Sequence, residues 1–80
     1  MPLRVTIELI PRGDESRKRK VAIVDIENDG TGTRERGNYI VRAQGHTVGG
    51  WDDFARERVT DVPRADYLNV AVACMNKVIR

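Results

Sequence analysis

One glycine-rich connection holds the acidic residues whose spacing comes nearest to a metal-binding motif. Asp25, Glu27 and Asp29 alternate and Gly30 follows, as in the first half of a calcium loop with its glycine at position six. The twelfth position, where such a loop needs a bidentate carboxylate, is Arg36. Strands rather than helices are expected on both sides, so the pattern favours a strand end and a glycine turn.

The same connection contains Gly30-Thr31-Gly32, whose backbone amides are of the kind that bind phosphate. A dinucleotide-binding fingerprint requires a third glycine where this chain has Glu35, and a helix where a strand is expected. The Gly-Lys-Ser/Thr ending of a phosphate loop does not occur in the sequence. Asn28-Asp29-Gly30 supplies residues that tolerate positive φ, so a tight connection between two strands is the favoured interpretation.

The sequence offers no recognisable catalytic set. His46 is the only histidine and is expected in a polar loop over 46–50, while the only serine, Ser16, falls in a charged turn, so no triad is indicated. Cys74 lies beside an apolar helical stripe and is expected to be a small buried residue. One cysteine and one histidine do not supply the usual four ligands of zinc. We therefore expect a protein that is not an enzyme and uses no cofactor or metal.

Two charged clusters remain. Asp52-Asp53 would point to opposite faces of a strand, which favours a solvated edge or a helix cap over a catalytic pair. Arg17-Lys18-Arg19-Lys20 is the densest basic run and is suited to sequence-independent contacts with nucleic-acid phosphates. Aromatic stacking platforms are scarce, so a charged, solvated hairpin edge is the favoured interpretation of this run.

Length and charge place the chain among small, charged domains. Eighty residues predict a single domain over 1–80, and 14 Lys+Arg against 12 Asp+Glu give a formal net charge of +2. That balance is typical neither of a DNA mimic nor of a strongly basic nucleic-acid binder. One cysteine excludes an internal disulfide framework. The alternating start is unlike a signal peptide and no apolar run approaches the ~20 residues of a membrane span, so we expect the cytoplasm of a bacterial host cell and no membrane partner.

Alternating hydrophobicity predicts strands over 3–9, 20–26 and 39–44, ended by Pro11, Asn28-Asp29-Gly30 and Gly45 respectively. The second of these is apolar on both faces, which indicates a central position in the sheet. Residues 51–62 are compatible with a helix or a strand. A fourth strand over their later half, with an irregular start at 51–54, is favoured by the strand propensity of the segment and by Pro63.

The last segment predicts an amphipathic helix with Asp66 as its N-cap. Its expected apolar stripe consists of Leu68, Ala71, Val72, Met75, Val78 and Ile79. An antiparallel sheet with one apolar face needs such a cover. We therefore predict an α+β fold, a three- or four-stranded antiparallel sheet with one C-terminal helix packed on a face.

The combined pattern resembles a family of short proteins from tailed phages and proteobacterial prophages. The residues that carry the resemblance are Ile7-Glu8-Leu9-Ile10-Pro11-x-Gly13-Asp14-Glu15-Ser16-Arg17, Ile26-x-Asn28-Asp29-Gly30-Thr31-Gly32-Thr33, Gly37-Asn38-Tyr39-x-Val41 and Val62-Pro63-Arg64. The chain is also similar to an anti-CRISPR inhibitor of a type I surveillance complex. The resemblance implies a stoichiometric inhibitor that binds this bacterial complex and sterically blocks recognition of target DNA.

Arginine and tryptophan are the residue types most enriched at interface hot spots. The expected partner-binding residues are therefore Arg17, Arg19, Arg34, Arg36 and Trp51. The basic run at 17–20 motivates a second interpretation, a small nucleic-acid-binding accessory protein of a phage.

Overall fold

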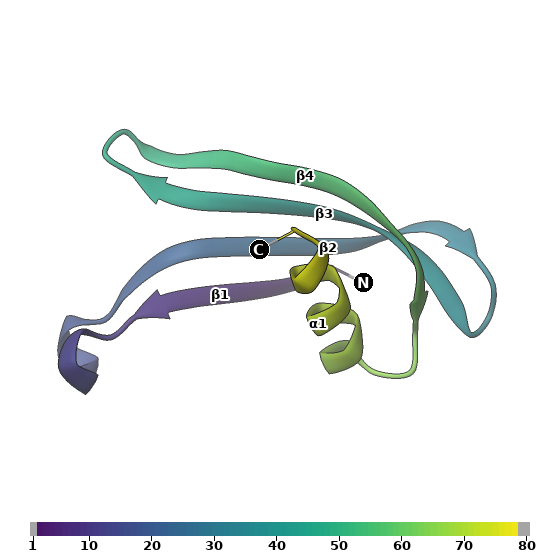
Figure 1. Ribbon diagram of the computed structural model, residues 1–80, viewed down its shortest axis with the longest axis horizontal. Coiled ribbons are helices and arrows are strands. Elements are labelled where there is room, and N and C mark those ends of the chain that lie inside the picture. The colour runs from purple at the N-terminus through teal and green to yellow at the C-terminus, as the bar shows by residue number, and fades with distance from the viewer. Residues whose placement is uncertain (1, 79–80) are drawn as a thin grey trace.

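The computed structural model describes residues 2–78, and the structural statements below refer to that range. One four-stranded antiparallel sheet has the order β1-β2-β3-β4, and one helix, α1, packs on it (Figure 1). The elements are β1 (Leu3–Leu9), β2 (Arg19–Gly32), β3 (Arg36–Thr47), β4 (Gly50–Pro63) and α1 (Tyr67–Val78). The predicted α+β fold is thereby confirmed.

The first strand and the turn after it follow the prediction. In β1, half-buried Leu3, Val5 and Ile7 alternate with exposed residues. The chain then forms two short 3-10 turns, Pro11–Gly13 and Glu15–Arg17, before β2 begins. The second 3-10 turn starts where the Asp14 carboxylate accepts a hydrogen bond from the Ser16 N–H at 3.1 Å.

The second strand is longer than predicted, because Asn28-Asp29-Gly30 does not end it. The side chains of Asn28 and Asp29 fold back to accept hydrogen bonds from the Gly30 and Thr31 N–H groups, at 2.6 and 2.9 Å. These local bonds replace cross-strand pairing for a few residues, and the register with β3 shifts there before Gly32 pairs with Gly37. The connection between β2 and β3 is therefore shorter than predicted and consists of Thr33, Arg34 and Glu35.

The third strand also extends beyond its predicted end at Gly45. It continues to Thr47, and a two-residue turn, Val48-Gly49, joins it to β4. The expected loop over 46–50 is therefore wrong, and His46 is a strand residue paired with Trp51. A two-residue connection of this kind is the tightest common hairpin, and Gly50 at φ 121° accommodates its backbone.

The fourth strand was correctly predicted over its later half, but it begins already at Gly50. Its predicted irregular start is a β-bulge, since Ala43 pairs with Ala55 and Gln44 with Asp53, leaving Phe54 without a partner. A second bulge lies at Asp61, whose φ is 59°. Both bulges accentuate the bend of this long edge strand.

The core lies between the sheet and α1. Its buried residues are Val24, Ile26, Tyr39, Val41, Ala43, Val59, Val62, Val70, Ala71 and Cys74. The apolar face predicted for the third strand (Tyr39, Val41, Ala43) is confirmed, and so is the burial of Cys74. That burial raises the pKa of the Cys74 thiol.

The predicted apolar stripe of the helix is only partly correct. Leu68 and Val72 are 73% and 50% exposed, whereas Val70 and Cys74 face the sheet. The buried residues of the helix are Val70, Ala71 and Cys74, all small or medium in size. Ile79, the last residue of the predicted stripe, lies outside the described residues.

The helix covers only part of its face of the sheet. The molecule measures 43 × 25 × 22 Å, and Figure 1 shows α1 nearer the β2–β3 connection than the opposite end. The other half of the sheet extends towards the β1–β2 and β3–β4 connections with no helix over it. Leu9 and Phe54, 44% and 54% exposed, belong to this uncovered half.

Candidate functional site

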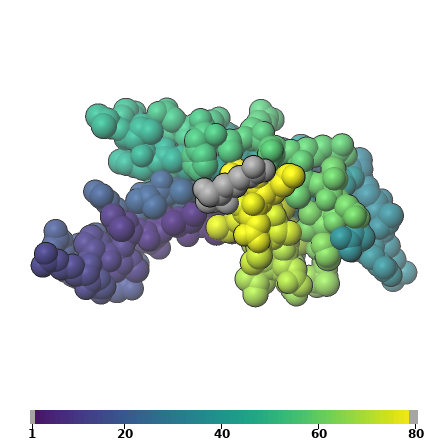
Figure 2. All heavy atoms as spheres, in the orientation of Figure 1, coloured from purple at the N-terminus to yellow at the C-terminus, as the bar shows by residue number. Residues whose placement is uncertain are grey.

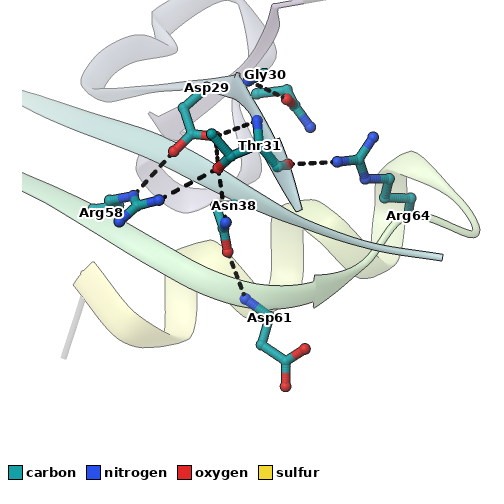
Figure 3. Close-up of polar contacts among 8 residues, drawn as sticks. Asp29, Gly30, Thr31, Asn38, Arg58, Asp61 and Arg64 are labelled. Atoms are coloured by element: carbon teal, nitrogen blue, oxygen red, sulfur yellow. Dashed lines mark hydrogen bonds and ion pairs between the residues drawn. The ribbon is translucent and has the colours of Figure 1, made fainter. Parts of the chain in front are cut away.

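The stretch that first suggested a ligand site is tied to the neighbouring strands by polar contacts (Figure 3). Asp29 Oδ1 accepts hydrogen bonds from the Thr31 N–H and hydroxyl, and Asp29 Oδ2 lies 3.0 Å from Arg58 Nε on β4. Thr31 Oγ1 accepts a hydrogen bond from Asn38 Nδ2 at 2.8 Å, and the Thr31 carbonyl accepts one from Arg64 at 2.7 Å. These groups are occupied within the protein, so the stretch holds β2, β3 and β4 together at this end.

Arg36 lies in the same region, and its guanidinium forms hydrogen bonds within the protein. Its Nε donates to Asp61 Oδ1 at 2.6 Å, and its Nη2 donates to the Asp61 carbonyl at 2.7 Å. The Asp61 N–H in turn donates to Asn38 Oδ1 at 3.1 Å (Figure 3). Arg36 therefore stabilises the second bulge of β4 by binding both the side chain and the backbone of Asp61. Arg34 lies in the connection itself and is exposed.

Three carboxylates have pKa values below the ordinary range of aspartate because of hydrogen bonds to the charged form. The Arg4 guanidinium lowers the pKa of Asp25, and the Thr31 hydroxyl and N–H, then Arg58, lower that of Asp29. The Gln44 amide, followed by Arg42, lowers the pKa of Asp53. Each of the three carboxylates has at least one of these hydrogen-bond partners on a neighbouring strand. The low pKa values of the carboxylates therefore depend on an intact sheet.

Acid is therefore expected to destabilise the fold. A carboxyl with a lower pKa in the folded than in the unfolded state stabilises the fold above its unfolded value of about 3.9. That contribution is lost as the pH falls through the folded pKa. We expect the urea midpoint to be nearly constant between about pH 7 and 5 and to fall below about pH 4. Asp29→Asn should make that fall shallower, and an unchanged slope would contradict the assignment.

A cleft of about 730 Å³ opens between the start of α1 and the sheet. Its apolar side chains are Leu3, Ile26, Tyr39 and Val70, and its polar rim consists of Asn28, Arg64, Asp66 and Tyr67. The volume falls within the range of small-molecule sites. Two of the rim groups already have partners, because Arg64 donates to Thr31 and the predicted N-cap Asp66 accepts from the Asn69 N–H at 2.7 Å.

The topology divides the five expected contact residues between the two ends of the sheet. Arg17 and Arg19 lie in and after the β1–β2 connection, and Trp51 lies just after the β3–β4 turn at the same end. Arg34 and Arg36 lie at the opposite end. Figure 2 shows the β1–β2 and β3–β4 connections as two lobes at one end of the molecule.

Trp51 is an exposed aromatic residue beside the β3–β4 connection. It is 39% exposed, and its ring packs edge-on against His46, with centroids 5.3 Å apart and planes at 74°. Nearby, Arg42 Nε and Gln44 Nε2 both donate to Asp53 Oδ1 at 3.0 Å. The indole therefore stands on an ordered surface of β3 and β4 side chains.

Sequence reasoning missed the exposed apolar side chains at this end. Phe54 packs over Gly45, where a Cβ would lie 3.2 Å from its ring, and Leu9 and Val48 are exposed close to the two connections. Alternation marked Leu9 as apolar, but its exposure depends on where α1 packs, which the sequence pattern does not specify.

Comparisons with known proteins found no relative of this chain. The chain matches no protein-family model, no curated protein and no solved structure. Within residues 2–78, no group of three or more His, Cys, Asp or Glu side chains is arranged to hold a metal ion. The same range contains no helix with the length and apolar character of a membrane span.

Proposed function

We propose that this chain is a protein-binding module, an anti-CRISPR inhibitor of phage or prophage origin. Its proposed partner is a type I CRISPR surveillance complex, whose recognition of target DNA it blocks sterically. The proposal has two supports, the resemblance of the sequence and the exposed aromatic and cationic side chains at one end of the sheet. Arg17, Arg19 and Trp51 form this end, which we call the Arg–Trp end.

The composition of the Arg–Trp end suits a protein interface. Arginine and tryptophan dominate hot spots because they bury a large area and make directional contacts. Contact with His46 already restricts the Trp51 ring, so binding orders less of the surface and costs less conformational entropy. A net charge of +2 is unlike that of a DNA mimic, and a steric block is the mode that fits this surface.

A second candidate is a small nucleic-acid-binding accessory protein. One observation favours it: all four residues of the run Arg17-Lys18-Arg19-Lys20 are exposed, where the β1–β2 connection passes into β2. Only Lys18 has an ion-pair partner within the described residues, Glu15 at 3.6 Å. Such a cluster would contact phosphates and bind with a strong salt dependence.

The proposed function is tested by co-elution with purified type I complexes and by target-DNA binding of those complexes. We expect the wild-type chain to co-elute and to abolish DNA binding at stoichiometric amounts. Trp51→Ala should weaken the association by about 30-fold or more, the effect of losing a hot spot of ~2 kcal/mol. The sequence suggested Arg34 as a contact as well, but Arg34 lies at the opposite end of the sheet from the Arg–Trp end, so Arg34→Ala is the control and should leave the affinity within about threefold.

Two results would reject this function. Failure to co-elute with any type I complex would remove the proposed partner. Salt-sensitive binding of the isolated chain to DNA or RNA in fluorescence anisotropy, lost in an Arg17→Ala/Arg19→Ala variant, would favour the accessory-protein candidate instead.

A further inference from the structure

The sheet ends in two edge strands of different character. Free strand edges present N–H and C=O groups that can pair with another chain. β4 carries bulges at Phe54 and Asp61, and self-pairing centred on Glu57 would set Arg56 of one copy opposite Arg58 of the other. Like charges in that position are destabilising. The β4 edge is therefore protected against pairing with itself.

The β1 edge has none of these features. Between Leu3 and Leu9 it contains no proline, no lysine and no inserted residue, because the irregularity opposite Ile7 and Glu8 adds its extra residue, Val21, to β2. In its sequence, Leu-Arg-Val-Thr-Ile-Glu-Leu, apolar residues mirror apolar ones about Thr6, and Arg4 mirrors the oppositely charged Glu8. An antiparallel partner of identical sequence would therefore meet a complementary residue at every position.

We propose that the chain forms a symmetric dimer in which β1 pairs antiparallel with β1 of a second copy, centred on Thr6. The two four-stranded sheets then join into one continuous sheet of eight strands. This surface is distinct from the Arg–Trp end, and the proposal does not depend on the identity of the protein's target.

On the solvent face, this register sets Arg4 of each copy opposite Glu8 of the other and the two Thr6 side chains opposite each other. Opposite charges and paired threonines are among the cross-strand pairs that stabilise antiparallel sheets. Arg4 is already oriented by two hydrogen bonds to Asp25, at 2.6 and 3.1 Å, and its side chain remains 65% exposed. Glu8 is exposed. Both side chains can therefore meet without a rearrangement of the strand, with the Arg4 guanidinium shared between Asp25 of its own copy and Glu8 of the other.

On the helix-bearing face, the same register sets Leu3 opposite Leu9 and Val5 opposite Ile7. Leu3, Val5 and Ile7 are half-buried in a single copy, whereas Leu9 is 44% exposed. Pairing covers the exposed edge of this row with apolar side chains of the second copy. The hydrophobic gain therefore acts in the same register as the charge pairs.

Other registers match less well. A centre at Val5 or Ile7 keeps each side chain on its own face but loses strand pairs and places Arg4 or Glu8 opposite Thr6. A centre between two residues would set apolar side chains opposite charged ones. Pro2 and Pro11, which lack an N–H, lie beyond the two ends of the strand. Thr6 is the centre that uses all seven residues of β1.

The position of α1 agrees with this arrangement. Both helices would stand on the same side of the joined sheet, because the two-fold axis is perpendicular to it. α1 packs beside Leu3, and Figure 1 shows its first turns drawn outside the β1 edge. Since Leu3 faces Leu9 of the second copy, each helix would approach the uncovered half of the other sheet. Leu68 and Val72, exposed on α1, are the apolar side chains available to cover it.

The dimer is tested by light scattering coupled to size-exclusion chromatography over a series of concentrations. The wild-type chain should elute with about twice its mass of 9.0 kDa and dissociate on dilution. Glu8→Arg sets cations opposite each other twice per dimer and should raise the dissociation constant by about tenfold or more. Glu57→Arg makes the same charge change on the β4 edge and should leave the dimer unchanged.

A cysteine at the two-fold axis gives a second test that does not require a charge change. Directly opposite residues have Cβ atoms about 4.5–5.5 Å apart, close to disulfide geometry. Thr6→Cys should therefore form a covalent dimer on mild oxidation, while native Cys74 is buried and should not react. Thr60→Cys on β4 is the control, and it should run as a monomer in denaturing gel electrophoresis without a reducing agent. A wild-type chain that stays monomeric at all concentrations, or equal cross-linking of both variants, would overturn the dimer.

Discussion

Replacing Ile26 with alanine is expected to lower the free energy of unfolding by about 2–5 kcal/mol, the usual cost of deleting a buried isoleucine side chain. Ile26 is 1% exposed and lies on β2, between Leu3 of β1 and Val41 of β3. The truncation removes apolar contacts with the neighbouring strands, and paired strands cannot move together to fill the space. A chain of 80 residues has a total stability of about 4–12 kcal/mol, so the loss is a large fraction of it.

Urea unfolding followed by circular dichroism measures this effect, and Ile40→Ala is the matched control. Ile40 is the same residue type, lies on the neighbouring strand β3, and points to the opposite face, where it is 41% exposed. Its truncation should cost less than about 1 kcal/mol because little apolar area is buried there. Equal losses for the two variants would show that the core does not lie on the helix-bearing face.

Strand identity and strand faces were predictable because they depend on local alternation. Leu3 to Leu9 and the buried face of Tyr39, Val41 and Ala43 follow from a period of two, which fixes which side chains share a face. Strand ends were not predictable in the same way. Asn28-Asp29-Gly30 has the composition of a turn, yet its side chains bond to the adjacent backbone, the strand continues, and pairing with β3 resumes at Gly32.

The helix shows a different limit of sequence reasoning. Periodicity predicted an amphipathic helix and its N-cap, Asp66, but the buried side is set by the position at which α1 meets the sheet. Leu68 and Val72 are at least as hydrophobic as Val70 and Cys74, yet Leu68 and Val72 are exposed whereas Val70 and Cys74 are buried. The contacts of α1 with β4 and β3 decide which side of the helix is buried, and no pattern within the helix alone reveals that.

The sequence could suggest which residue types are suited to an interface, but only the topology shows where these residues lie. The sequence identified arginines and a tryptophan suited to an interface, but the hairpin connections decide which of them lie together. Trp51 lies at the same end of the sheet as Arg17 and Arg19, in the separate β3–β4 hairpin, because that hairpin turns at the end where β1 meets β2. Arg36 is removed from the set of freely available cations by Asp61, a residue at a bulge.

Replacing Gly32 with alanine is expected to cost about 2–4 kcal/mol of folding stability. Gly32 has φ 102°, which a residue with a Cβ adopts only under strain of about 1–3 kcal/mol. A Cβ there would also lie 2.6 Å from the Arg36 carbonyl oxygen and 2.9 Å from the Gly37 Cα. Both are backbone atoms, and the same carbonyl accepts the Thr33 N–H at 2.7 Å, so relief of the clash requires opening the hairpin.

Gly49→Ala provides the control in the other hairpin, since a Cβ at Gly49 meets nothing within 4 Å. Its stability should change by less than about 1 kcal/mol, and a stabilising change is compatible with the lower entropy of the unfolded chain. The comparison separates two roles for the glycine-rich stretch. A glycine kept for ligand contact would tolerate alanine in the isolated protein, whereas a glycine required by the fold would not. A large loss at Gly32, measured without any ligand, therefore assigns this glycine to the β2–β3 connection itself, and a loss no greater than at Gly49 would reopen the case for a ligand there.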